Sequence, residues 1–200
     1  MNKRTKVRRL TLAAMMGAVA FILMYFSLSV PVLSPFASFD LSCLPELIGG
    51  FILGPAGAIE IISVKILLKL VFKGTTSLFT GEVQKFLLSA AYVLPAVLYY
   101  RSRRTKKAAA SSLVLGSICG VITAILTNVF LIFPVYMKLY GMDWAAIVDM
   151  CTAVNPWITN IPTMIAFSIV PFNIISYGVT SLLAMLTYKK ISVPLKKFAA

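Results

Sequence analysis

The chain has 200 residues, of which 60% are hydrophobic and only 12% are charged. Together with several apolar stretches of about 20 residues, this composition excludes an ordinary soluble domain and indicates an integral membrane protein. The net charge is +13, but the basic residues stand at the ends of apolar segments and have no soluble scaffold. We therefore expect anionic lipid headgroups, and not nucleic acid, as the partner of this charge.

Most of the 19 Lys and Arg residues fall into clusters at the N-terminus, in the middle and at the C-terminus. Cytoplasmic loops of membrane proteins hold an excess of Lys and Arg, so we place all of these clusters on the inner face. An even number of crossings must then separate neighbouring clusters, and both termini are expected in the cytoplasm of a multi-pass cell-membrane protein. The clusters are Lys3/Arg4/Lys6/Arg8/Arg9, Arg101/Arg103/Arg104/Lys106/Lys107 and Lys189/Lys190/Lys196/Lys197.

Apolar segments predict an all-α integral membrane fold of six transmembrane helices in a single domain, 1–200. The second and third segments could form one helix, but Gly54 and Pro55 interrupt them, and a proline removes a helix hydrogen bond. Two crossings here keep the count even. The second is short, about 16 Å against about 30 Å of hydrocarbon, so neighbouring helices must shield it. The spans are predicted at 10–32, 44–54, 56–73, 83–100, 108–134 and 157–188.

In this topology the segments 31–43, 73–82 and 136–156 face outward. The first is rich in Pro, Ser and aromatic residues, so we interpret it as a lid loop over a ligand site at the outer face. Charged residues within a membrane span usually face a polar cavity or an ion-pair partner. We expect this of Lys65 in the third span, where Glu60 is a candidate partner although the helical spacing would strain a direct pair.

Helix-packing and amide motifs each leave two interpretations open. Small residues at four-residue spacing near the N-terminus, Ala13/Gly17 and Ala14/Ala18, could pack inside the chain or dock a second membrane subunit. Asn128 and Asn173 lie in apolar spans. Each could bond a neighbouring helix or recognise the edge of a polar heterocycle.

Residues for enzyme chemistry are sparse. The cysteines Cys43, Cys119 and Cys151 are far apart without CxxC spacing, so neither a disulfide framework nor a metal site is expected. The chain has no His and no G-x-x-x-x-G-K-[ST] motif, so we expect no enzyme activity and no ATPase of its own.

Several segments resemble a known family. FASFDLSCLPELIGGFILGP, GTTSLFTGEVQKFL, TNVFLIFPVYMKLYGM and PFN together resemble the substrate-binding S component of an energy-coupling factor (ECF) vitamin importer, above all its riboflavin-specific members. The resemblance covers nearly the whole chain, and the segment 127–142 is its most specific part.

The resemblance implies a function and a site. In this family six helices bind one vitamin near the outer surface. The S component works with a transmembrane T component and two ATPase subunits, which it meets through an alanine-rich strip on the first helix. The chain is thus expected to bind riboflavin or flavin mononucleotide as transported ligand, without a cofactor. The candidate substrate-binding residues are Phe39, Asp40, Leu41, Lys65, Gly81, Glu82, Asn128, Asn173 and Ser176, and the candidate docking residues are Ala13, Ala14, Gly17 and Ala18.

The chain also departs from the riboflavin-specific pattern at four positions. Ser176 stands where those members usually carry Lys, and Cys43 stands where an Asp is expected. Lys85 and Ile66 each replace an Asn. Loss of a cation beside a ring is not a conservative change. An S component for a different vitamin is therefore the alternative, and a membrane-embedded enzyme or a structural subunit is a more remote one.

Overall fold

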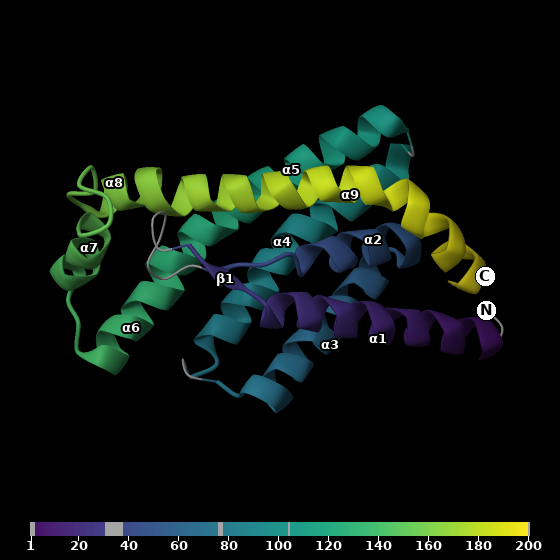
Figure 1. Cartoon of the computed structure of the whole chain (residues 1–200), viewed down its shortest axis with the longest axis horizontal. Coiled ribbons are helices and arrows are strands. Elements are labelled where there is room, and N and C mark those ends of the chain that lie inside the picture. The colour runs from purple at the N-terminus through teal and green to yellow at the C-terminus, as the bar shows by residue number, and fades with distance from the viewer. Residues whose placement is uncertain (1–2, 31–37, 76–77, 104, 200) are drawn as a thin grey trace.

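The computed structural model describes residues 3–30, 38–75, 78–103 and 105–199, with the backbone alone for 106 and 189–199. These residues form an elongated bundle of helices with one short two-stranded ribbon (Figure 1). In chain order the elements are α1 (Lys3–Tyr25), β1 (Leu28–Ser29), β2 (Ser38–Phe39), α2 (Cys43–Leu53), α3 (Pro55–Lys73), α4 (Thr80–Arg103), α5 (Lys106–Thr127), the π-helix η1 (Asn128–Ile132), α6 (Phe133–Tyr140), α7 (Trp144–Thr152), α8 (Ile161–Met164), the π-helix η2 (Ile165–Ile169) and α9 (Val170–Ala199).

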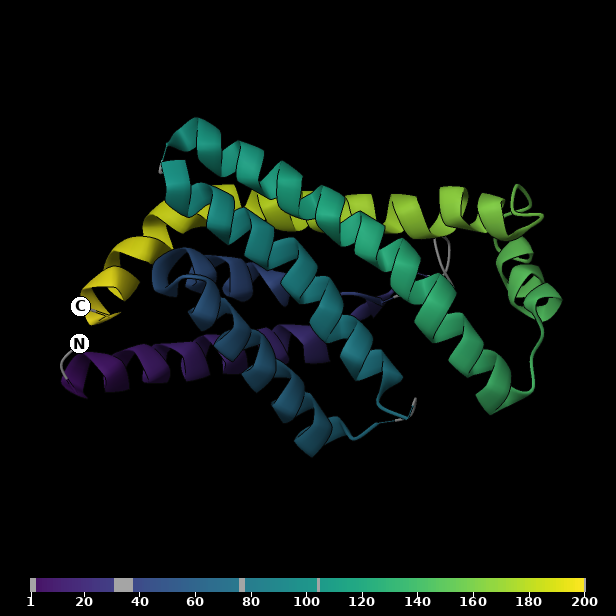
Figure 2. The same cartoon turned by 180° about the vertical axis from the view of Figure 1, so that it is seen from behind.

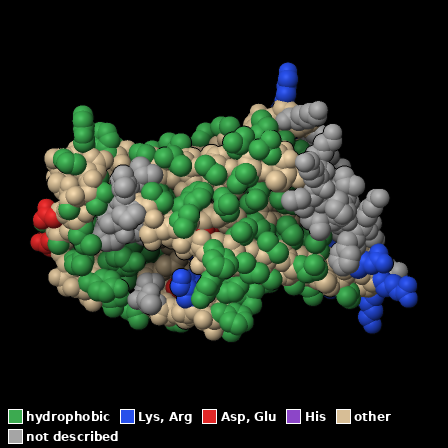
Figure 3. Space-filling model, in the orientation of Figure 1, with side chains coloured by type: hydrophobic (Ala, Val, Ile, Leu, Met, Phe, Trp, Pro, Cys, Tyr) green, Lys and Arg blue, Asp and Glu red, His purple; other side chains and the backbone are tan. Residues whose placement is uncertain are grey.

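Four helical segments of the described residues are long and apolar enough to cross a membrane, namely Lys3–Tyr25, Thr80–Arg103, Lys107–Tyr140 and Ile161–Tyr188. α2 is a shorter apolar helix of 11 residues, and α3 has 19 residues but carries several charges. Large apolar side chains are exposed over much of the surface (Figure 3), including Leu67, Val114, Phe130 and Leu182. A surface of this kind suits contact with lipid, because such exposure would be unfavourable in water.

The helix break predicted at Gly54 and Pro55 is present. Gly54 adopts a φ of +91°, which favours glycine, and its N–H donates to the carbonyl oxygen of Gly50 at 2.8 Å. α2 and α3 then fold back against each other. A Cβ atom added at Gly49 would lie 2.2 Å from Cδ1 of Ile61, so a larger residue at this contact would require the end of the Ile61 side chain to move.

Several predicted boundaries need correction. The first span ends at Tyr25 and not at residue 32, because the chain then enters the antiparallel ribbon, in which Leu28 pairs with Phe39. The outward segment predicted at 136–156 is largely helical, with α6 reaching Tyr140 and α7 capped by Asp143. The last span begins later than residue 157, since Asn160 caps α8 and marks its start. Residues 31–37 of the predicted lid loop lie outside the described residues.

Two π-helices lie within the long helical segments Lys107–Tyr140 and Ile161–Tyr188. Phe133 N–H bonds to the carbonyl oxygen of Asn128, and Val170 N–H bonds in the same way to Ile165, five residues back in both cases. A proline follows each of these residues directly. Because a proline ring clashes with the preceding turn and donates no hydrogen bond, the wider turn lets the helix continue without breaking. The two prolines are Pro134 and Pro171.

The two ends of the bundle differ in charge. The N-terminus, the α4–α5 connection and the C-terminus lie at one end, here called the basic end (Figures 1 and 2). Arg9 donates from Nη2 to the carbonyl oxygen of Leu53 at 2.7 Å and so ties α1 to the end of α2. The opposite half, which carries β1, β2, α6 and α7, is here called the distal half, and acidic side chains reach the surface there (Figure 3). Asp143, which caps α7, and Asp149 within α7 are exposed.

In the middle of the bundle α4 packs tightly against α5, and its Tyr92 side chain reaches α9. A Cβ atom at Gly116 would lie 2.3 Å from the carbonyl oxygen of Tyr92, so α5 approaches α4 almost backbone to backbone. The ring of Tyr92 stacks on Tyr177 with centroids 4.5 Å apart, and its hydroxyl bonds to Ser181 Oγ at 2.7 Å. Tyr177 also lines the site described next.

Candidate functional site

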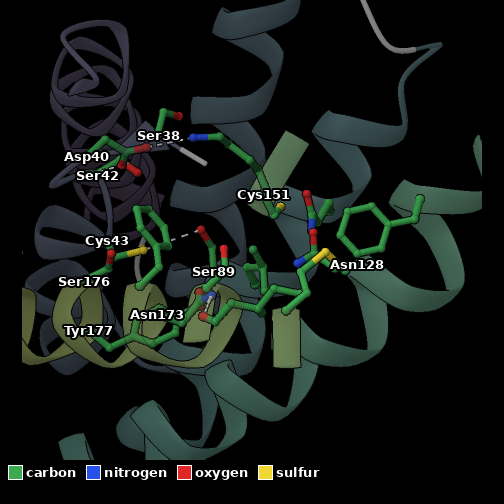
Figure 4. Close-up of a pocket in the computed structure, with 18 of the residues that line it drawn as sticks. Ser38, Asp40, Ser42, Cys43, Ser89, Asn128, Cys151, Asn173, Ser176 and Tyr177 are labelled. Atoms are coloured by element: carbon green, nitrogen blue, oxygen red, sulfur yellow. Dashed lines mark hydrogen bonds and ion pairs between the residues drawn. The ribbon is translucent and has the colours of Figure 1, made fainter. Parts of the chain in front are cut away.

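A cavity of about 170 Å³ lies between β2, α2, α3 and α4 on one side and the two π-containing helices on the other. Figure 4 shows Asp40 and Asn128 on opposite sides of it, with Asn173, Ser176 and Tyr177 projecting from α9. Five of the predicted site residues line this cavity, although they come from four different segments of the chain. They are Asp40, Lys65, Asn128, Asn173 and Ser176.

Lys65 is fully buried, and its partner is Glu46 of α2. Its ammonium group also donates to Ser89 Oγ at 2.8 Å and to Ser42 Oγ at 3.2 Å. The predicted pairing role is therefore present, but the candidate partner Glu60 is exposed on another part of α3. Because Glu46 pairs with Lys65, Lys65 adds no free positive charge to the cavity.

A second ion pair closes the wall next to β2. Lys85 Nζ lies 2.8 Å from Asp40 Oδ2, while Asp40 Oδ1 accepts a hydrogen bond from the backbone N–H of Ser42 at 2.9 Å. Burial opposes ionisation of Asp40, but the nearby ammonium groups of Lys85 and Lys65, together with these hydrogen bonds, outweigh it. They lower the pKa of Asp40 to about 2. With both pairs ionised, the wall carries no net charge.

The two asparagines lie on the two π-containing helices, Asn128 at the start of η1 and Asn173 four residues after the end of η2. Asn128 Nδ2 donates to the carbonyl oxygen of Ala124 at 2.7 Å, and Asn173 Nδ2 donates to that of Ile169 at 2.8 Å. Each amide thus bonds to its own helix, and neither makes the predicted bond to a neighbouring helix among the described residues. Their amide oxygens accept no hydrogen bond from another described residue, so they are available to a ligand.

Ser176 and its surroundings complete the wall formed by α9. Its Oγ is buried and has no hydrogen-bond partner among the described residues. The departure at Cys43 lies in the same cavity, with Sγ 3.8 Å from Ser89 Oγ (Figure 4). A buried hydroxyl without a partner is costly, so it favours a ligand that can complete its hydrogen bonding.

Other candidate residues lie outside the cavity. Glu82 pairs with Lys69 and accepts a hydrogen bond from Thr75 Oγ1 at 3.1 Å. Gly81 precedes it at the start of α4. Among the residues that line the cavity, neither Phe39 nor Leu41 is present, although both flank Asp40.

Sequence reasoning missed several residues that the fold brings to the cavity. Glu46 carried a usable signal, because a lone acid in a short apolar span needs a partner. Gln84, whose Nε2 donates to Thr127 Oγ1 at 3.3 Å, lies within the recognised segment GTTSLFTGEVQKFL but was not singled out as a site residue. The remaining ones gave no signal in isolation. They are Ser38, Ser42, Leu88, Ser89, Phe133, Cys151, Met164, Ser168, Ile169, Phe172 and Tyr177.

The composition of the cavity indicates its chemistry. Balanced charges, amide and hydroxyl groups, and aromatic rings would suit a neutral, planar ligand with hydrogen-bonding edges. No group of His, Cys, Asp and Glu that could hold a metal ion occurs among the described residues. The cavity therefore has the features of a binding site for an organic molecule.

The candidate docking residues on α1 separate into two faces. Ala13 and Gly17 are buried, and a Cβ atom at Gly17 would lie 2.6 Å from the side chain of Val64 on α3. Ala14 is exposed and Ala18 is partly exposed. The first pair therefore packs inside the chain, and only the second is accessible to another subunit.

The relationship to known proteins agrees with this geometry. The family described as "ECF transporter, substrate-specific component" matches residues 8–188. The chain belongs to this family. It is thus a component of a membrane transport system rather than a member of an enzyme family, and the predicted family is confirmed.

Individual relatives extend over nearly the full length. The chain is 31% identical to the riboflavin transporter RibU of Staphylococcus aureus, over 98% of this chain and 100% of that one. It is 26% identical to the riboflavin transporter FmnP of Bacillus subtilis, over 93% of each. A solved structure, titled "Structure and mechanism of the S component of a bacterial ECF transporter", superposes with a TM-score of 0.71 at 28% identity, covering 96% of this chain and 99% of that chain.

Proposed function

We propose that the chain binds riboflavin or a close flavin in the cavity described above and imports it as the substrate-specific subunit of an ATP-driven ECF transporter. The observation that carries this proposal is the charge-balanced, amide-lined cavity in a chain whose relatives are riboflavin transporters. A T component and two ATPase subunits would supply the energy, since the sequence has no phosphate-binding motif for ATP.

The basic end would face the cytoplasm, as the excess of Lys and Arg requires. α2 and α3 would then count as two crossings, which gives six in total and places the cavity toward the outer face. Because α2 is too short to cross alone, its burial against α1, α3, α4 and α9 supports its inclusion as a shielded span. The segment between β1 and β2 would cover the cavity as a lid.

Ligand binding by the purified chain tests this proposal. The protein should retain a flavin absorption spectrum through washing, and after removal of the ligand it should bind riboflavin stoichiometrically without any effect of added ATP. Lys138→Gln on the exposed part of α6 serves as a control that leaves binding unchanged, because Lys138 does not line the cavity. Tight binding of another vitamin, with no binding of riboflavin, would refute the flavin assignment and leave the family unchanged.

A further inference from the structure

A groove of about 500 Å³ lies between α5 and α9, on the outside of the bundle. The two helices pack against each other and cross in Figure 2. Both belong to segments that are long and apolar enough to cross a membrane. Among the described residues the groove shares no lining residue with the ligand cavity, which uses a different face of α9. The groove therefore opens toward lipid.

The length of the groove matches one leaflet of a bilayer. On α5 it runs from Ala110 to Ile122, which is about 18 Å at 1.5 Å per residue. The hydrocarbon of a bilayer is about 30 Å thick, so each leaflet contributes about 15 Å. Because α5 begins at Lys106, next to the α4–α5 connection, the groove crosses the leaflet at the basic end. A single acyl chain of that leaflet would extend along it.

The walls of the groove suit a hydrocarbon chain. No charged side chain is among the described residues that line it. Its two serines are already engaged within the protein, since Ser117 Oγ donates to the carbonyl oxygen of Leu113 at 2.9 Å and Ser181 Oγ lies 2.7 Å from the hydroxyl of Tyr92. An apolar occupant therefore leaves no buried polar group without a partner.

The shape of the groove favours an acyl chain over a transmembrane helix. Gly178 of α9 is exposed, and a Cβ atom added there would meet nothing within 4 Å. The rims on either side are bulky and exposed, with Val114 and Ile118 on α5 and Ile174 on α9. Helices approach each other closely where small residues line the contact. Bulky rims keep a helix backbone away, whereas a narrow chain of methylene groups fits between them.

A lysine stands where the headgroup of such a lipid would lie. Lys107 precedes Ala110 by three residues, so it lies on the face of α5 that lines the groove, at the basic end. It is exposed and has no carboxylate partner within the described ranges. Anionic headgroups attract basic residues at the membrane surface. A zwitterionic headgroup would bring a cation of its own close to the many Lys and Arg residues of this end.

We propose that the groove between α5 and α9 binds one anionic phospholipid from the leaflet at the basic end. One acyl chain lies along the groove past Gly178, and the headgroup phosphate lies at Lys107. The lipid is a partner distinct from the transported ligand, since its site and the ligand cavity use different residues. The proposal therefore stands or falls independently of which vitamin the chain transports.

Native mass spectrometry of the purified full chain tests the groove. The protein is freed of lipid in detergent and titrated with phosphatidylglycerol or with phosphatidylcholine of the same acyl chains. The unmodified chain should retain one phosphatidylglycerol in preference to phosphatidylcholine. Gly178→Phe should weaken retention of both lipids by about tenfold or more, because its ring fills the groove, and Gly178→Leu should have a smaller effect. Ile175→Phe is the matched control at an exposed position of α9 outside the groove and should change neither.

The headgroup contact has its own variants. Lys107→Gln should reduce the preference for phosphatidylglycerol about fivefold, and Lys107→Arg should preserve it. Lys3→Gln removes another exposed lysine of the basic end, away from the groove, and should leave the preference unchanged. Equal effects of Lys107→Gln and Lys3→Gln would show that the charge of the whole basic end, and not Lys107, selects the lipid, which overturns the headgroup assignment.

Two further results would overturn the groove as a lipid site. Equal lipid retention by Gly178→Phe and Ile175→Phe would mean that lipids coat the surface without a specific site. Conversion of a dimer into a monomer by Gly178→Phe, measured by the same mass spectra, would assign the groove to a second copy of the chain. Thermal unfolding without lipid should be the same for both Phe variants, because a side chain at position 178 meets open space.

Discussion

Lys65 of α3 and Glu46 of α2 form an ion pair whose two side chains are 1% and 0% exposed. The pair lies at the wall of the ligand cavity and links two helices that the break at Gly54 separates. Taking two charges out of a polar solvent is costly, and their attraction repays that cost only when further hydrogen bonds satisfy them. Ser42 and Ser89 supply such bonds to Lys65, so the pair fixes how α2 sits against α3 and α4.

Removal of one partner of the Lys65–Glu46 ion pair should destabilise the chain far more than removal of both partners. Lys65→Met or Glu46→Leu alone should lower the free energy of unfolding by about 3–5 kcal/mol, because each leaves a buried charge without its partner. The double variant should recover much of this loss. Thermal unfolding in detergent of the two single variants and the double variant measures the coupling. Additive effects would show that the two residues do not act as a pair.

The asparagines should contribute to ligand binding rather than to folding. Asn128→Leu and Asn173→Leu should each weaken riboflavin binding by about 1–3 kcal/mol, since each removes an amide oxygen that has no protein partner among the described residues. Isothermal titration of both variants checks this. Thermal unfolding without ligand is the control, and unchanged affinity with reduced stability would assign the amides a structural role.

The position of the basic clusters at one end of the bundle was predictable from the sequence. Clustered Lys and Arg required an even number of crossings between clusters, and the clusters do lie at one end of the bundle (Figure 2). The break before Pro55 followed from the chemistry of proline. Pro134 and Pro171 do not end their helices. In each case a π-helical turn precedes the proline, and the helix continues past it. A single sequence does not distinguish these two outcomes, since they depend on the packing of neighbouring helices.

The site was predictable only in part. A lysine in an apolar span predicted a buried partner for Lys65, and the nearest acid on its own helix was Glu60, although the spacing strained that pair. The observed partner, Glu46, lies 19 positions earlier in the sequence, on another helix. Serines 42 and 89 give no signal in isolation, because serine is common both in helices and at their ends. Only the fold shows that they surround one ammonium group.

The exposed alanines of α1 give a prediction about transport. Ala14→Trp should block cellular uptake of riboflavin and leave binding by the purified chain nearly unchanged, because a bulky ring prevents close approach of another subunit. Ala13→Trp is the contrasting variant. Ala13 is buried at 1% exposure, so its replacement should destabilise the chain itself. Normal uptake by the Ala14→Trp variant would exclude this face as the docking surface.

The lowered pKa of Asp40 predicts how the stability of the chain depends on pH. Its pKa in the folded chain is about 2, below its ordinary value of 3.8. A carboxyl whose pKa is lowered by folding stabilises the folded state above its ordinary pKa, and this contribution is lost as the pH falls toward 2. Asp40→Asn should therefore reduce stability by a constant amount above about pH 4, and the difference from the unmodified chain should shrink between about pH 4 and pH 2. Thermal unfolding of both proteins across this range measures it. A difference that does not depend on pH would contradict the role given to the pair with Lys85.

The surroundings of Ser176 suggest a test of which edge of a flavin ring faces α9. Its hydroxyl is buried, has no partner among the described residues and projects from α9 into the cavity (Figure 4). The ionised groups around it already balance, so a lysine at this position would add one uncompensated cation facing the ligand. A carbonyl edge of a flavin ring is a hydrogen-bond acceptor and would gain a charge-assisted bond.

We therefore expect Ser176→Lys to bind riboflavin more tightly than the unmodified chain. Ser176→Met is the matched control, because it adds a side chain of similar length without a charge. Titration of all three proteins with riboflavin at fixed salt separates the two effects. If the Lys and Met variants weaken binding equally, steric bulk dominates and no carbonyl edge faces position 176. If the Lys variant binds more tightly and the Met variant does not, the polar edge of the flavin ring lies against α9.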